Sequence, residues 1–134
     1  MIAISGALQD ALVAQAQDQA PNECCGLLEL DAASMTVLEM HPMKNIAASP
    51  MRFELGSTDL LRLPEIEASG RTPVIYHSHT DSEAIPSQTD LNFAKNWPGV
   101  PWLIIGLDSE VPVLRWFQID EGAVQELQVA RADD

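Results

Sequence analysis

The chain has 134 residues, of which 46% are hydrophobic, and this length and composition predict one domain spanning residues 1–134 rather than two. Twenty acidic residues against seven basic ones give a net charge of −13, and the few basic residues are scattered, so we expect no nucleic-acid or anionic-membrane partner. The acidity fits either a basic partner or a saline habitat, and the sequence does not decide between them.

No targeting segment is recognisable in the sequence. Polar residues occupy the N-terminal stretch where the apolar part of a secretion signal would lie, and the longest apolar runs have the length of a strand. Cys24 and Cys25 are adjacent, and a disulfide between neighbours would be strained. We therefore expect a cytoplasmic protein.

The elements predicted in chain order begin with a short edge strand at residues 1–4. Ser5 is expected to cap a helix that runs to about residue 19. Pro21 disfavours helical geometry in the residue before it, and a mostly apolar strand follows at 23–30. A second strand at 34–40 is expected to pair with it as a hairpin.

The middle of the chain predicts a third strand at 51–55 and then a helical segment at 57–69, which Pro64 bends or splits. A strand at 72–77 and a helix at 87–97 come next. Turn residues separate three further strands, which are expected at 101–106, 112–119 and 124–129. This order predicts a single mixed β-sheet with flanking helices, in the α/β or the α+β class.

Two histidines, His77 and His79, lie at the end of the strand predicted at 72–77. Side chains two residues apart on a strand share a face, so both imidazoles can converge on one ion. Ser87 and Asp90 share a face at the start of the next helix. Two neutral imidazoles and a carboxylate suit Zn²⁺ and leave a fourth position for water, as in a catalytic site. The alternative is one packed and one solvated histidine beside an ordinary helix N-cap.

A base for hydrolysis is not evident within that stretch, because nothing fixes the positions of Asp81 and Glu83 in the intervening loop. Glu23 stands out instead, since it lies at the rim of a mostly apolar strand. Periodicity alone favours a solvated side chain at this position. If this strand neighbours the histidine strand, Glu23 would lie near the zinc water, able to take its proton and give it to a leaving amine.

Residues at fixed spacing carry a resemblance to a known family: Glu23, then His77-Ser78-His79, seven residues, Ser87, two residues and Asp90. These residues match the signature of the JAMM (MPN+) metallopeptidases at every position. The segments at 21–28 and 45–50 also look like bacterial members. The resemblance implies a cytidine-deaminase-like α/β fold. Ser78 should point to the face opposite the histidines, where it packs or supports the ligands.

The resemblance also implies a role for each residue of the motif. His77, His79 and Asp90 would hold Zn²⁺, which lowers the pKa of a bound water from 15.7 toward roughly 7. Glu23 would be the general base and acid. Ser87 would donate a hydrogen bond to the oxyanion of the tetrahedral intermediate, which is worth about 3 kcal/mol.

The family cleaves peptide or isopeptide bonds after the C-terminal glycines of ubiquitin-like proteins. The loop at 79–90 looks most like bacterial members that act on sulfur-carrier proteins and release an amino acid, notably cysteine, from the carrier's C-terminal diglycine during cysteine biosynthesis. A hydrolase that frees such modifiers from protein lysines is the alternative.

Two non-hydrolytic functions are alternatives to an enzyme. The complete ligand set argues against a non-catalytic MPN scaffold, and a metal-binding module without turnover would not need Glu23. A homodimer is compatible with several edge strands. His41 matches no ligand position and is expected to be structural or solvated.

Overall fold

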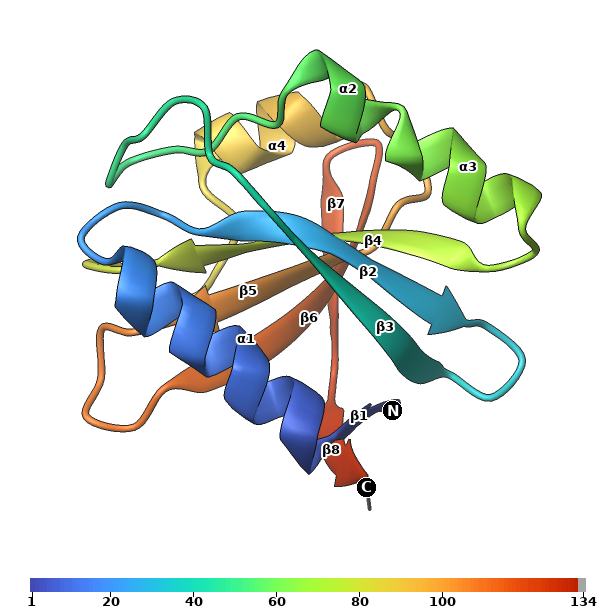
Figure 1. Cartoon of the computed structure of the whole chain (residues 1–134), viewed down its shortest axis with the longest axis horizontal. Coiled ribbons are helices and arrows are strands. Elements are labelled where there is room, and N and C mark those ends of the chain that lie inside the picture. Colours follow the sequence, from blue (N-terminus) through green and yellow to red (C-terminus); the bar gives the residue numbers. More distant parts are fainter. Residues whose placement is uncertain (133–134) are drawn as a thin grey trace.

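Eight strands form one mixed sheet in the computed structural model, which describes residues 1–132 (Figure 1). The strands are β1 (Ile2–Ser5), β2 (Cys25–Asp31), β3 (Thr36–Met43), β4 (Thr72–His79), β5 (Trp102–Gly106), β6 (Val113–Asp120), β7 (Ala123–Leu127) and β8 (Val129–Ala132). The helices are α1 (Gly6–Gln19), α2 (Ser57–Leu60), α3 (Arg62–Ala68) and α4 (Gln88–Ala94).

The strand order is β7-β6-β5-β4-β2-β3-β1-β8, with β4 antiparallel to β2 and parallel to β5. The two outer strands follow one another in the chain, because only Gln128 separates β7 from β8. Leu127 pairs with Trp116 on β6, whereas Val129 pairs with Ile2 on β1. Because β7 and β8 are consecutive in the chain and lie at opposite edges of the sheet, the sheet must curve so that its two edges approach each other.

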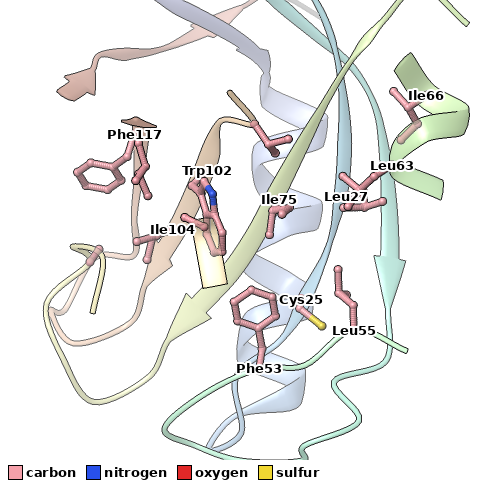
Figure 2. Packing of buried hydrophobic residues seen from close by; sticks show 14 residues of the cluster. Cys25, Leu27, Phe53, Leu55, Leu63, Ile66, Ile75, Trp102, Ile104 and Phe117 are labelled. Carbon is pink, nitrogen blue, oxygen red and sulfur yellow. The ribbon is translucent and has the colours of Figure 1, made fainter. Parts of the chain in front are cut away.

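Helices cover both faces of the sheet, with α1 on one face and α2, α3 and α4 on the other (Figure 1). Leu12 and Ala16 of α1 pack in one buried cluster with Tyr76 and Trp116. The cluster on the other face contains Cys25, Leu27, Phe53, Leu63, Ile66, Ile75, Trp102, Ile104 and Phe117, and Figure 2 shows Phe53 between Cys25 and Trp102. Because β4 is buried on both faces, residues 73–76 in its middle form a continuous apolar run, which the polar residues 77–79 of the candidate site follow.

The predicted α/β class, with a single mixed sheet and flanking helices, is confirmed. The β2–β3 hairpin is confirmed as well. Ser5 caps α1, because its hydroxyl oxygen accepts from the Leu8 amide at 3.1 Å. The helical segment after Ser57 is split, but at Leu61; Pro64 lies in the first turn of α3, where its missing N–H is not needed.

Some boundaries were predicted wrongly. β1 is not an edge strand, because β8 pairs with it on the side away from β3. The last predicted strand is divided at Gln128 by the change of partner. The helix predicted at 87–97 ends at Ala94 and continues as a turn.

The strand predicted at 51–55 is also wrong, since this segment is irregular. Its polar groups are bound within its own loop rather than by a neighbouring strand. The Glu54 amide donates to Asn45 Oδ1 at 2.9 Å, and Asn45 Nδ2 donates to the Arg52 carbonyl at 3.0 Å. Two of its apolar residues, Phe53 and Leu55, are instead buried in the cluster that α3 and α4 also join.

None of the helices described in residues 1–132 has the length and apolar character needed to span a membrane. Both cysteines are free and buried.

Candidate metal centre

The three predicted ligands come together between the end of β4 and the start of α4. His77 and His79 point to the same face of β4, and their Nε2 atoms lie 3.1 Å apart. Each of these nitrogens also lies 3.1 Å from Asp90 Oδ2. All three side chains are buried. The spacing of two on the strand therefore delivers two nitrogens and a carboxylate oxygen to one point.

This arrangement fits a zinc ion. A tetrahedral zinc with ligands about 2.0–2.1 Å away holds those ligands roughly 3.3 Å from one another. The three donor atoms have nearly this spacing, although no covalent constraint keeps them together. Three ligands leave the fourth position of such an ion open, which is typical of a catalytic zinc and not of a structural one.

Neighbouring groups orient the two imidazoles. His79 Nδ1 lies 2.8 Å from the Glu83 carbonyl, which can only accept a hydrogen bond, so the ring proton is on Nδ1 and the Nε2 lone pair faces the cluster. The His77 ring stacks on Phe53 with a centroid distance of 4.6 Å, and Trp102 meets it edge-on at 5.6 Å. The aromatic contacts fix the plane of His77.

The α4 N-terminus orients the carboxylate through a capping box. The Ser87 amide donates to Asp90 Oδ2 at 2.9 Å, and the Asp90 amide donates to Ser87 Oγ at 3.1 Å. Asp90 is therefore both a member of the helix cap and a predicted metal ligand. The interpretation of Ser87 and Asp90 as a helix cap does not exclude their interpretation as site residues.

Burial and charge favour the ligating forms of two of these groups. Burial lowers the pKa of His77, so its ring stays neutral. Burial alone would raise the pKa of Asp90, but His77, His79 and the Ser87 amide lower it well below its usual range. Neutral imidazole and ionised carboxylate are the forms that bind a cation.

Glu23 lies at the same site, in the lining of a cleft of about 330 Å³. The lining residues are Glu23, Pro50, Met51, His79, Asp81, Ser82 and Ser87. The antiparallel pairing of β2 with β4 brings Glu23 there, since Cys25 lies opposite His77. Glu23 is only 4% exposed, and its Oε1 has no hydrogen-bond partner among the described residues. The pKa of Glu23 is raised to about 8. Burial is the largest cause, the charge of His79 partly opposes the rise, and the charge of Asp90 adds to it.

The structure thus brings all the predicted site residues together. Glu23, His79 and Ser87 line the cleft. His77 and Asp90 are not in its lining, but both contact His79. Ser78 points away from the histidines, and its hydroxyl accepts from the Cys24 amide at 2.8 Å.

The cleft residues Pro50, Met51 and Ser82 were not predicted from the sequence, and the resemblance at 45–50 gave a signal for Pro50 alone. Asp81, whose position the sequence does not fix, also lines the cleft, but its side chain is exposed.

A second group of possible ligands, Glu29, Glu39 and His41, lies on β2 and β3. Glu29 is already paired there: His41 Nε2 lies 2.6 Å from one of its oxygens and Arg71 lies 3.0 Å from the other. The hydrogen bond with His41 is the largest cause that lowers the pKa of Glu29 to about 2. Because a guanidinium occupies this group, we assign it as an ion-pair network, in agreement with the structural role expected for His41.

Comparison with known proteins gives one family. The model of the prokaryotic homologues of the JAB domain (Prok-JAB) matches residues 5–119. The chain is 34% identical over 122 residues to a desampylase of Haloferax volcanii, covering 86% of this chain and 87% of the relative. It is 35% identical over 129 residues to a CysO-cysteine peptidase of Mycobacterium tuberculosis, covering 94% and 88%. A solution structure from Desulfitobacterium hafniense is similar with a TM-score of 0.83 and 28% identity, covering 100% of this chain and 94% of the other.

Proposed function

The chain belongs to the prokaryotic JAB-domain family, and from this premise we propose that it is a zinc-dependent hydrolase of the bond that follows the C-terminal diglycine of a ubiquitin-like sulfur-carrier protein. The observation that carries the proposal is the position of Glu23, buried at the wall of one cleft with His79 and Ser87. A non-catalytic scaffold or a metal-storage site would not need a buried carboxylate there.

His77, His79 and Asp90 would hold the ion. When bound, zinc supplies Lewis acidity that lowers the pKa of a water molecule to roughly 7. Asp90 contributes the negative charge, and the burial of all three donors strengthens its attraction for a cation because the local dielectric is low.

Glu23 would carry the proton. In hydrolysis a water oxygen bonds to the carbonyl carbon, the carbon–nitrogen bond breaks, and one proton moves from the water to the leaving nitrogen. A carboxyl group whose pKa lies near 8 holds a proton readily at neutral pH, and a nearby cation would lower that value into the range where it can also accept one. Glu23 Oε1 has no hydrogen-bond partner among the described residues, so no other protein group competes for this proton.

Ser87 would stabilise the oxyanion. Its hydroxyl oxygen accepts a hydrogen bond from the Asp90 amide, so the hydroxyl proton is free to donate a hydrogen bond into the cleft. The helix cap therefore fixes the position of the donor without using its proton.

Ser87→Ala is expected to lower kcat about 10²- to 10³-fold, the usual cost of one lost oxyanion donor. It should also lower the free energy of unfolding by about 1 kcal/mol, because the N-cap of α4 is lost. Steady-state kinetics and urea unfolding measure the two effects. Ser87→Thr is the control, since it keeps both the cap and the donor; loss of activity in Ser87→Thr equal to that in Ser87→Ala would contradict the donor role.

The relatives support two versions of the reaction. The CysO-cysteine peptidase supports release of cysteine from a carrier, and the desampylase supports a deconjugating isopeptidase that acts on modified lysines. Both versions need the same proton transfer to a leaving amine, so the site alone does not choose between them. We propose the first version, because its relative matches more of this chain.

The test is incubation of the zinc-loaded chain with two substrates: a sulfur carrier extended by cysteine after its diglycine, and the same carrier joined to a lysine side chain. Mass spectrometry should show free cysteine and a carrier ending in diglycine. Cleavage of the lysine conjugate alone would favour the alternative, and cleavage of neither would contradict the proposed function.

A further inference from the structure

Glu23 is held by residues outside regular structure. It lies in the segment at 21–24, between α1 and β2, which we call the base segment. The C-terminal end of β4 and the residue after it bind this segment. The hydroxyl of Thr80, which follows β4, donates to the Pro21 carbonyl at 3.0 Å, and the Cys24 amide donates to the hydroxyl of Ser78 on β4 at 2.8 Å. These bonds hold the ends of the base segment but not Glu23 itself.

Both main-chain groups of Glu23 are bound by the loop at 45–54. Its amide donates to the Ser49 carbonyl at 2.9 Å, and its carbonyl accepts from Asn45 Nδ2 at 3.0 Å. The position of the carboxylate therefore depends on this loop as well as on the sheet.

The side chain of Asn45 organises the loop. Besides the Glu23 carbonyl, Nδ2 reaches the Arg52 carbonyl at 3.0 Å. Oδ1 accepts from the amides of Ala47 at 3.0 Å and Glu54 at 2.9 Å. An asparagine amide has two donor hydrogens and two acceptor lone pairs, so all four are in use. Aspartate would keep the two acceptor bonds and lose both donor bonds.

The same loop forms a wall of the cleft. Pro50 and Met51 lie across from His79 and Ser87, and Met51 is 79% exposed at the mouth. A substrate chain bound in this cleft would contact both this wall and Glu23. The wall and the base are thus parts of one hydrogen-bonded unit that Asn45 closes.

We propose that Asn45 is a positioning residue that holds Glu23 in register with the metal ligands and couples it to the cleft wall formed by Pro50 and Met51. Its effect on turnover rests on the proposed function, whereas the coupling itself is a property of the folded chain.

Two variants of the full zinc-loaded chain separate these parts. Asn45→Asp keeps the two bonds accepted from the Ala47 and Glu54 amides and loses both donor bonds, to the Glu23 and Arg52 carbonyls. Asn45→Ala loses all four bonds without adding a charge. Asn96→Ala is the matched control, because Asn96 is exposed in the turn after α4. Zinc content, amide hydrogen exchange and the kinetics with the carrier–cysteine fusion are measured for each.

Both Asn45 variants should keep zinc, exchange the Glu23 amide faster than wild type and lose kcat about 10- to 100-fold, the cost of a small misplacement of a catalytic group. Only Asn45→Ala should also speed hydrogen exchange at the Ala47 and Glu54 amides, because it loses the oxygen that accepts from them. The same variant should raise KM, because the cleft wall formed by Pro50 and Met51 is then less well held. Asn96→Ala should match wild type.

Wild-type exchange at Glu23 together with wild-type kcat in Asn45→Asp would overturn the proposal, as would a kcat that falls only in proportion to the unfolded fraction. If the wild-type chain does not cleave the fusion, the proposed function fails, and the exchange of the Glu23 amide alone decides whether Asn45 positions it.

Discussion

Glu23→Gln is expected to retain zinc and to lose hydrolysis by about 10²- to 10⁴-fold, the usual contribution of a general base. Glutamine has nearly the same shape and leaves His77, His79 and Asp90 in place, but its amide cannot accept and then return a proton. Zinc content by elemental analysis and cleavage of the carrier–cysteine fusion by mass spectrometry measure the two properties on one sample. Glu67→Gln, which changes an exposed carboxylate on α3, is the matched control. Undiminished cleavage by Glu23→Gln would remove the proposed mechanism.

The same variant reports on the burial of Glu23 without any substrate. Burial raises the pKa of Glu23 from 4.5 to about 8, so between these values the folded, metal-free chain binds a proton that the unfolded chain has released. The contribution of Glu23 to the free energy of unfolding is therefore greatest below the unfolded pKa and falls as the pH rises toward 8. Urea unfolding in chelator should show this fall in wild type and a flatter profile in Glu23→Gln; parallel profiles would place the carboxylate in solvent.

His77→Ala is expected to lose the metal and, with it, all measurable hydrolysis. Removal of one of three protein ligands should lower zinc affinity by more than about 100-fold, because even loss of a group that merely supports a ligand costs 10- to 100-fold. The variant also loses the ring that stacks on Phe53, so thermal unfolding must first establish that it is folded. Competition with a chromophoric chelator then measures the affinity.

His41→Ala is the matched control for that variant. It removes the histidine of the Glu29 network, which lies on β2 and β3 and not at the cleft, and it should bind zinc as wild type does. A folded His77→Ala variant with wild-type zinc affinity would refute the ligand assignment.

The cluster of His77, His79 and Asp90 could be predicted from local rules alone. A strand alternates its side chains with a period of two, so His77 and His79 had to share a face, and the first turn of a helix places Ser87 and Asp90 within reach of each other. The place of Glu23 at the site could not be predicted in this way. Glu23 reaches the site only because β2 pairs with β4, a contact between distant parts of the chain, and local periodicity favoured a solvated side chain.

The errors of prediction have the same origin. Residues 51–55 have the composition of a strand, but Asn45 binds the polar groups that a neighbouring strand would need. The division of the last strand at Gln128 follows from the curvature of the whole sheet, for which no local residue gives a signal. A cytoplasmic location and a homodimer stay predictions.

The most direct test of the account is a zinc titration of the chelator-treated full chain, followed at each step by cleavage of the carrier–cysteine fusion. Cleavage should be absent without zinc and should rise in proportion to the metal until each chain holds a single ion, while Glu23→Gln binds the same amount without cleavage. Cleavage that persists in the metal-free chain, or that Glu23→Gln performs at the wild-type rate, would contradict the joint action of Glu23 and the three ligands.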